Sequence, residues 1–236
     1  MNAVVTGAAT GIGRAIARRF AAEGMTLLLA DVSARLGEVV AELEGGGAEV
    51  AAAQVDLTTV AGQEEVRLLV KSAGTLGALI NNAGITRDAR LVNLSDDAFA
   101  AVLDVNLGAT FQLTTELIPL LDDGGAVVNL ASRAYLGNFG QYNYSVSKGG
   151  VVGMTRALAL ELAPRVRVNA IAPGLIGTEM TMAIPAEVRE KMVAAVPLGR
   201  MGTPEEVADL AAFLVSDSSS YLTGEVIVIG GGRSLA

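Results

Sequence analysis

Tyr144 and Lys148 are the two residues of this chain best suited to acid–base chemistry. They are four residues apart, so on a helix they share a face, with Cβ atoms roughly 5–6 Å apart. At that distance a lysine ammonium can favour the ionised form of a tyrosine hydroxyl, whose unperturbed pKa of about 10 is too high for proton transfer at neutral pH. No other tyrosine has a lysine four residues after it. The spacing also arises by chance, so its interpretation depends on the rest of the chain.

The composition narrows the possible mechanisms. The 236 residues include no histidine and no cysteine. A catalytic zinc usually takes ligands from these residues, and Ser-His or Cys-His nucleophiles need an imidazole. We therefore expect no metal site and no disulfide, and any general acid or base must be Tyr, Lys, Asp or Glu.

Charge and hydropathy indicate a globular protein that works on a small molecule. The net charge is -8 and 51% of the residues are hydrophobic, which argues against nucleic acid or an anionic membrane as a partner and allows a large core. No apolar run reaches the ~20 residues that span a bilayer, and Met1 leads almost directly into a predicted strand. We expect one domain over residues 1–236, without a signal peptide and located in the cytoplasm.

A glycine-rich turn follows the first predicted strand. Residues 3–5 are apolar, Thr6 to Gly13 contains glycines at positions 7, 11 and 13, and a helical pattern runs from Arg14 to Glu23. Glycines allow the backbone to approach a pyrophosphate, and the N-terminus of a helix offers free N–H groups to its charge. The turn therefore predicts a phosphate-binding site, although a tight left-handed turn would use the same residues.

Acidic residues follow the second and third predicted strands. Asp31 ends the strand from Thr26 to Ala30, at the distance of ~20 residues from the glycines at which a carboxylate binds the adenosine ribose. Capping of the helix predicted at 34–43 is the alternative. Asp56 follows the strand at 48–55; its carboxylate could accept a hydrogen bond from adenine or serve the cap at Thr58 or Thr59.

Polar and small residues also follow the later strands. The segment from Asn81 to Gly84, Ser132, and Pro173-Gly174 each come directly after an apolar run. Strands are predicted at 3–5, 26–30, 48–55, 78–80, 126–130, 166–172 and 226–229, with helices between them, including one at 105–121 that contains Asn106. This alternation predicts a doubly wound, Rossmann-type α/β fold, a seven-stranded parallel sheet with helices on both faces whose ligand lies at the carboxyl ends of the strands.

The motifs together resemble the short-chain dehydrogenase/reductase family over essentially the whole chain. The matching features are the glycine turn, the Asn-Asn-Ala-Gly segment, Asn106, Ser132, the Tyr144/Lys148 pair and Pro173-Gly174. The resemblance is strongest to the branch that contains 3-oxoacyl-[acyl-carrier-protein] reductases and NAD-dependent alcohol dehydrogenases. It implies hydride transfer without a metal, a substrate lid at 175–200, and a homotetramer built through the two long helices and the last strand.

The resemblance also implies roles for individual residues. Tyr144 would be the acid/base, Lys148 would lower its pKa and bind the nicotinamide ribose, Ser132 would bind the substrate oxygen, and Asn106 would hold a water molecule. Thr178 would help to fix the carboxamide. The implied cofactor-binding residues are Gly7, Thr10, Gly11, Ile12, Gly13, Asp31, Asp56, Leu57, Asn82, Ala83, Gly84, Tyr144, Lys148, Pro173, Gly174, Ile176 and Thr178.

Two departures from the family pattern bear on this interpretation. Ser132 precedes Tyr144 by twelve residues, where many members have thirteen, so the intervening loop is expected to be short. Thr10 stands in the turn where NADP-preferring members carry a basic residue. Together with Asp31 it predicts NAD(H) rather than NADP(H).

The substrate is predicted from charge. Asp122-Asp123 precedes the fifth strand and disfavours an acidic carrier protein, although Arg133 and Arg165 are also expected near the site. We therefore expect a small or medium secondary alcohol or its ketone, with a 3-oxoacyl-[acyl-carrier-protein] reductase as the alternative. A non-catalytic dinucleotide-binding regulator is a remote alternative, because such a chain is expected to lose Tyr144 or Lys148.

Overall fold

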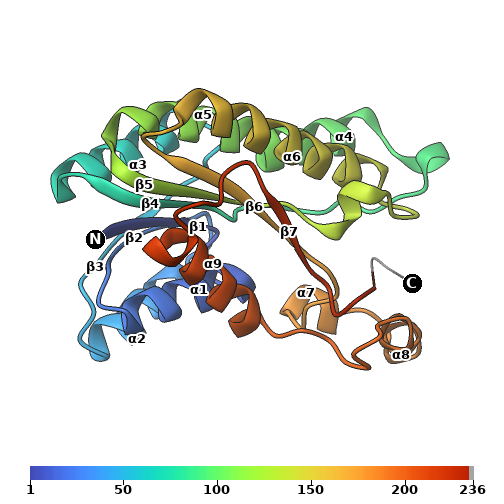
Figure 1. Cartoon of the computed structure of the whole chain (residues 1–236). Coiled ribbons are helices and arrows are strands. Elements are labelled where there is room, and N and C mark those ends of the chain that lie inside the picture. The colour runs from blue at the N-terminus through green and yellow to red at the C-terminus, as the bar shows by residue number, and fades with distance from the viewer. Residues whose placement is uncertain (234–236) are drawn as a thin grey trace.

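Parallel strands in the order β3-β2-β1-β4-β5-β6-β7 form the centre of the computed structural model, which describes residues 1–233 (Figure 1). The strands are β1 (Asn2–Thr6), β2 (Thr26–Asp31), β3 (Val50–Gln54), β4 (Leu76–Asn81), β5 (Leu121–Leu130), β6 (Arg167–Pro173) and β7 (Val226–Ile229). The order reverses between β1 and β4, which is where ligands bind in sheets of this kind. The predicted seven-stranded parallel sheet is confirmed.

Helices cover both faces of the sheet because successive side chains of each buried strand point to opposite faces. Ala3 and Val5 pack in one apolar cluster, whereas Val4 between them packs in the other. In Figure 1 the first face carries α1 (Gly11–Ala22), α2 (Leu36–Gly45) and α9 (Pro204–Val215); the second carries α3 (Val60–Ala73), α4 (Asp96–Leu103), α5 (Ala109–Leu117) and α6 (Tyr142–Leu162). Within residues 1–233, no helix combines the length and apolar character needed to cross a membrane.

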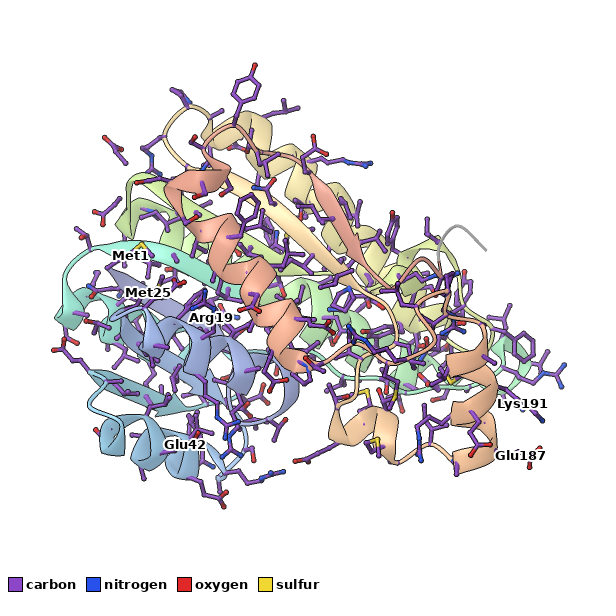
Figure 2. All side chains as sticks on the ribbon, turned by 60° about the horizontal axis from the view of Figure 1, so that its bottom comes forward. Met1, Arg19, Met25, Glu42, Glu187 and Lys191 are labelled. Carbon is purple, nitrogen blue, oxygen red and sulfur yellow. The ribbon has the colours of Figure 1, made fainter. Side chains whose placement is uncertain are left out.

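Residues 175–200 contain two short helices, α7 (Glu179–Met182) and α8 (Ala186–Ala194), beside the carboxyl end of the sheet. The role of this segment as a substrate lid, which the resemblance implies, stays a prediction. Figure 2 shows Glu187 and Lys191 of α8 at the outer end of the molecule, where they form an ion pair of 2.8 Å between positions i and i+4.

The helix predicted at 105–121 is wrong in its boundaries. The chain forms a π-helical turn at Asp104–Gly108, continues as α5, and ends in a 3₁₀ turn at Ile118–Leu120. Leu121 already belongs to β5, where it pairs with Leu76 of β4. Pro119 lacks the N–H that a continuing helix needs, so the helix stops early and the strand begins five residues before the predicted Ala126.

A ladder of buried amides and hydroxyls connects the two central strands to the helices above them. Asn81 Nδ2 donates to Thr114 Oγ1 (2.9 Å) and to Asn129 Oδ1 (2.8 Å). Asn129 Nδ2 in turn donates to Thr155 Oγ1 (2.9 Å). These contacts join α5, β4, β5 and α6. The first asparagine of the Asn-Asn-Ala-Gly segment therefore has a structural role in joining the two strands to α5.

Replacing Asn129 by leucine is expected to destabilise the fold by about 2 kcal/mol, because one amide and one hydroxyl lose a buried partner. The free energy of unfolding, measured in urea, tests this. Asn93→Leu at an exposed position is the matched control and should change the stability little. Equal stabilities for Asn129→Leu and the wild type would show that the ladder adds nothing.

Candidate active site

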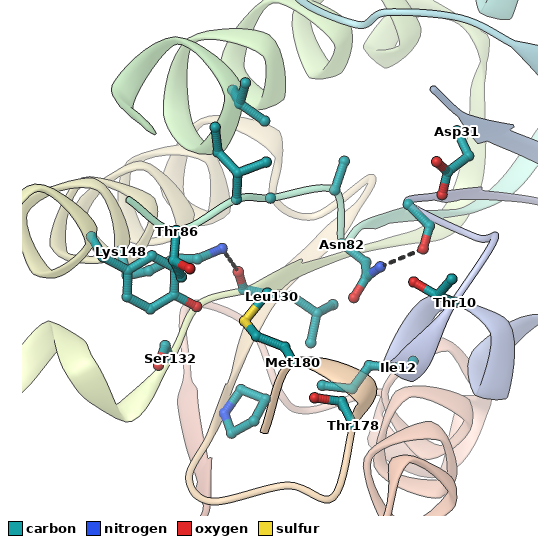
Figure 3. Close-up of a pocket in the computed structure, with 18 of the residues that line it drawn as sticks. Thr10, Ile12, Asp31, Asn82, Thr86, Leu130, Ser132, Lys148, Thr178 and Met180 are labelled. Carbon is teal, nitrogen blue, oxygen red and sulfur yellow. Dashed lines mark hydrogen bonds between the residues drawn. The ribbon is translucent and has the colours of Figure 1, made fainter. Parts of the chain in front are cut away.

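A cleft of about 510 Å³ lies at the carboxyl edge of the sheet, at the point where the strand order reverses (Figure 3). It is lined by every predicted site residue except Gly13 and Asn106. Sequence reasoning missed several further residues of the lining: Val32, Val55, Thr58, Ile85, Thr86, Val105, Leu130, Ala131, Glu179, Met180 and Thr181. Most of them are adjacent in the sequence to predicted residues. Their position next to a strand end could therefore have assigned them to the cleft.

The glycine turn after β1 lies against the turn after β4. Asn82 Nδ2 donates to the carbonyl oxygens of Thr6 and Gly7, both at 3.0 Å; Figure 3 shows Asn82 with one of these two bonds. A Cβ atom on Gly7 would lie 2.8 Å from that nitrogen, and φ of Gly7 is +64°, so both space and backbone conformation require glycine. The turn thus leaves the backbone of Gly7, Thr10 and Gly11 open toward the cleft.

Gly13 has a packing role beside the glycine turn. It is buried in α1, and a Cβ atom there would stand 2.0 Å from the carbonyl oxygen of Gly7. The absent side chain lets α1 start directly behind the turn. Gly13 therefore shapes the site through Gly7, and its contact with the cofactor stays a prediction.

Asp31 faces the cleft with both carboxylate oxygens held by backbone amides. Oδ2 accepts from Ala9 N and Oδ1 from Ser33 N, each at 2.8 Å. The alternative that Asp31 caps the next helix is wrong, because α2 begins at Leu36, its N-cap residue is Arg35, and no side chain caps it. The carboxylate is thus fixed at the rim where an adenosine ribose would lie.

Asp56 supports the turn before α3 and also lines the cleft. Its Oδ1 accepts from Thr58 N (2.9 Å) and Thr58 Oγ1 (2.7 Å), and these bonds, the backbone one first, lower the pKa of Asp56. The cap of α3 is Thr59, whose hydroxyl accepts from Gly62 N. Asp56 and Leu57 both line the cleft, so the ionised carboxylate is available to a ligand in a fixed orientation.

Tyr144 and Lys148 lie on one face of α6, as their spacing predicts. Lys148 Nζ is 5.7 Å from the centroid of the Tyr144 ring and donates to the carbonyl oxygen of Leu130 at 2.6 Å (Figure 3). Ser132 lines the same cleft, and its Oγ accepts from Ala134 N at 3.2 Å within a 3₁₀ turn. The short loop between Ser132 and Tyr144 therefore still brings the serine into the site.

The expected lowering of the Tyr144 pKa by Lys148 is wrong for the protein alone. Burial raises the pKa of Tyr144, the nearby Ser132 hydroxyl acts in the opposite direction, and the charge of Asp88 raises it further. Burial also lowers the pKa of Lys148 to about 8, and its ammonium points to Leu130. Desolvation disfavours the charged form of both groups and is the largest cause of both shifts.

Asn106 lies behind the cleft, and both ends of its side-chain amide are hydrogen-bonded to protein. In the π-helical turn, Oδ1 accepts from Ile85 N (2.8 Å), while Nδ2 donates to Ile85 O (3.0 Å) and to Ser147 Oγ (3.1 Å). The water-binding role implied for Asn106 stays a prediction. A Cβ atom on Gly84 would lie 3.1 Å from Asn106 Oδ1 and 3.5 Å from Lys148 Nζ, so Asn106 positions the turn beside the lysine.

The segment after β6 closes the far side of the cleft. Pro173, Gly174 and Ile176 line it, and Gly174 N donates to Ile229 O (2.9 Å). The methyl group of Thr178 lies 3.5 Å from the position of a Cβ atom on Gly11, so the loops that follow β1 and β6 meet. Thr178 also caps α7 through its hydroxyl.

The shape and chemistry of the cleft fit a nicotinamide dinucleotide. The cleft has the carboxylate of Asp31 at one end and the Tyr144/Lys148 pair at the other, with the glycine turn between them. At Gly7 of this turn there is no room for a Cβ atom. The backbone N–H groups at the start of α1 suit a pyrophosphate, and Asp31 suits the hydroxyls of a ribose. The individual catalytic and binding roles stay predictions.

Between pH 8 and 10 the free energy of unfolding is expected to rise, and Lys148→Met should remove about 2 kcal/mol of that rise. The folded pKa is about 8 and the ordinary value is 10.5, so in this window the unfolded chain binds more protons and stability increases with pH. Urea unfolding at several pH values measures it. Lys191→Met, at an exposed position, should keep the wild-type profile; an identical profile for Lys148→Met would contradict the assignment.

Comparison with known proteins agrees with this geometry. Residues 7–234 match a family model described as enoyl-(acyl carrier protein) reductase. The chain is 45% identical over 235 residues to the 3-oxoacyl-[acyl-carrier-protein] reductase of Thermotoga maritima, covering 97% of this chain and 96% of that protein. It is 44% identical over 240 residues to an uncharacterized oxidoreductase of Mycobacterium tuberculosis, covering 98% and 96%.

Solved structures show the same fold with related sequences. A short-chain dehydrogenase/reductase from Brucella melitensis, described as a glucose/ribitol dehydrogenase, superimposes with a TM-score of 0.96 at 36% identity, covering 100% of this chain and 97% of that chain. A dehydrogenase/reductase from Sinorhizobium meliloti gives 0.94 at 34% identity, with coverage of 98% and 94%. The resemblance read from the motifs is thereby confirmed: this chain belongs to the short-chain dehydrogenase/reductase family, oxidoreductases that bind a nicotinamide dinucleotide.

Proposed function

We propose that this protein reduces the ketone of a 3-oxoacyl thioester with NADH. The observation that carries the proposal is that one cleft holds Ser132, Tyr144 and Lys148 at one end and Asp31 at the other. Relatives named 3-oxoacyl-[acyl-carrier-protein] reductases, at 38–45% identity, support the substrate class.

The charge argument against an acyl carrier protein has no basis in the fold. Asp122 and Asp123 lie at the start of β5, at the sheet edge opposite the cleft. Arg165 lies at the same opposite edge, where its guanidinium donates to the carbonyl oxygens of Leu121 (2.6 Å) and Ile118 (3.1 Å). Without that argument, the names of the relatives favour the thioester, and oxidation of a simple secondary alcohol becomes the second choice.

In the proposed reaction the protein supplies the proton and the orientation. When bound, NADH would supply the hydride for the ketone carbon and would leave as NAD⁺. The Tyr144 hydroxyl gives its proton to the ketone oxygen, so the C=O π bond and the Tyr144 O–H bond break, a C–H and an O–H bond form on the substrate, and the product is a 3-hydroxyacyl thioester. Ser132 Oγ holds the same oxygen, and Lys148 holds the ribose hydroxyls next to Tyr144. A tyrosine whose pKa is raised by burial is protonated at neutral pH, which suits reduction.

The choice of NADH rests on the adenosine end of the cleft. Asp31 presents a carboxylate that is oriented by Ala9 N and Ser33 N. A ribose 2′-hydroxyl can donate to this carboxylate, whereas a 2′-phosphate would be repelled by it. Thr10, which lines the same cleft, offers no positive charge.

We also propose that the protein works in the cytoplasm as a homotetramer, with no nucleic acid or membrane partner. Assembly through the long helices is supported by large apolar side chains that are exposed on them, Phe111 of α5 (56% exposed) and Leu160 of α6 (85%).

Oxidation of NADH at 340 nm with a panel of substrates tests the function. We expect turnover with 3-oxoacyl thioesters on acyl carrier protein or on a short thiol, and a kcat/KM at least tenfold higher with NADH than with NADPH. Turnover of simple ketones but not thioesters would support the secondary alcohol dehydrogenase instead. Cofactor binding without any turnover would support a non-catalytic regulator.

Tyr144→Phe should reduce kcat by at least ~100-fold, the usual contribution of a general acid, and should leave NADH binding nearly unchanged. Stopped-flow turnover and fluorescence titration of NADH measure the two effects separately. Tyr142→Phe on the same helix, exposed by 50% and absent from the cleft lining, is the matched control. Wild-type turnover by Tyr144→Phe would remove this residue from the mechanism.

A further inference from the structure

An ion pair joins the two sides of the cleft at its adenosine end. Arg35 lies in the loop between β2 and α2, and Glu179 is the first residue of α7. Arg35 Nη1 and Nη2 donate to Glu179 Oε2 and Oε1, each at 2.9 Å. Two parallel bonds of this kind fix the guanidinium in the plane of the carboxylate. The ion pair thus connects the loop between β2 and α2, at the adenosine end, to α7 in the segment after β6.

The loop that carries Arg35 is folded around Asp31. Ser33 N donates to Asp31 Oδ1 (2.8 Å), and Arg35 N donates to Ser33 Oγ (3.3 Å). On the other side, Glu179 itself lines the cleft, next to Thr178. Arg35 itself does not line the cleft, but its guanidinium is bonded to Glu179, which does, and its backbone N–H belongs to the loop that is folded around Asp31.

The other arginines near this rim are paired as well. Arg14 and Arg18 of α1 both donate to Glu42 of α2, which Figure 2 labels. Arg35 lowers the pKa of Glu179, with a smaller contribution from the charge of Arg14, so the carboxylate is ionised at neutral pH. The rim thus contains cations, but each of them already binds a carboxylate.

We propose that Glu179 is a cofactor-specificity residue, which binds Arg35 and so withholds its guanidinium from the 2′-phosphate of NADP(H). This inference rests on the proposed use of NADH. An unpaired arginine at this place could form the same two parallel bonds with a phosphate. To do so here it must leave Glu179, and the freed carboxylate would then face the incoming dianion. Asp31 repels the phosphate, and Glu179 removes the cation that would compensate.

A double-mutant cycle tests the proposal through binding alone. The dissociation constants of NADH and NADPH are measured by fluorescence titration for the wild type, Glu179→Gln, Arg35→Gln and the double variant. In Glu179→Gln the ratio of the NADPH constant to the NADH constant should fall roughly two- to fivefold, the size that an exposed ion pair supports. In the Arg35→Gln background the same change should lower the ratio clearly less, because only the direct repulsion between the Glu179 carboxylate and the phosphate is then removed. A general loosening of α7 affects both cofactors and cancels in the ratio.

Glu187→Gln is the matched control, because Glu187 is also an ion-paired carboxylate of the 175–200 segment but does not line the cleft. Its ratio should equal that of the wild type. The proposal is overturned if Glu179→Gln leaves the ratio unchanged, if its effect is equally large without Arg35, or if Glu187→Gln produces the same shift. A wild-type preference for NADPH would contradict the proposed use of NADH. The change in the ratio between the wild type and Glu179→Gln would still show whether Glu179 disfavours NADPH.

Discussion

The site depends on the close approach of two backbone turns, the one after β1 and the one after β4. Thr6 Oγ1 accepts from the N–H groups of Asn82 and Ala83 at 2.9 and 3.0 Å, and Asn82 Nδ2 returns hydrogen bonds to the carbonyl oxygens of Thr6 and Gly7. These bonds satisfy backbone groups that a strand end leaves without partners. Because the side chains of Thr6 and Asn82 hold the two turns together, the cleft at the point where the strand order reverses keeps the backbone of Gly7 and Gly84 in its lining.

The catalytic end is held by contacts from three directions. Leu130 at the end of β5 binds the ammonium of Lys148, and Asn106 reaches α6 through Ser147, whose hydroxyl donates to the carbonyl oxygen of Tyr144. A π-helical turn, which is rare and often found at functional sites, places Asn106 there. Ser147 escaped the sequence analysis, although a small hydroxyl residue directly before the lysine was a usable signal.

The ionisable groups at the two ends of the cleft differ in burial. At the catalytic end it favours the neutral forms of Tyr144 and Lys148, so any charge that enters the cleft acts on both groups in a medium of low dielectric constant. At the adenosine end, Asp31 is held by backbone amides and the Arg35–Glu179 pair is exposed. The proposed mechanism therefore assigns proton transfer and selection of the cofactor to opposite ends of one cleft.

The sequence by itself determined the parallel sheet and most of the cleft lining, because strands separated by helices must run parallel and their carboxyl ends must then meet at one edge. Asp31, Ser132 and Gly174 could be assigned to that edge from their position alone.

Tertiary structure decided the features that depend on packing between distant segments. Gly13 lies behind the turn, and the side chain of Asn106 is bonded to Ile85 and Ser147. Asp122 and Arg165 lie at the opposite edge of the sheet. Burial raises the pKa of Tyr144. The ion pair between Arg35 and Glu179 joins residues 144 positions apart. Spacing along a chain predicts which residues share an element or an edge, but partners and desolvation arise only when the elements pack.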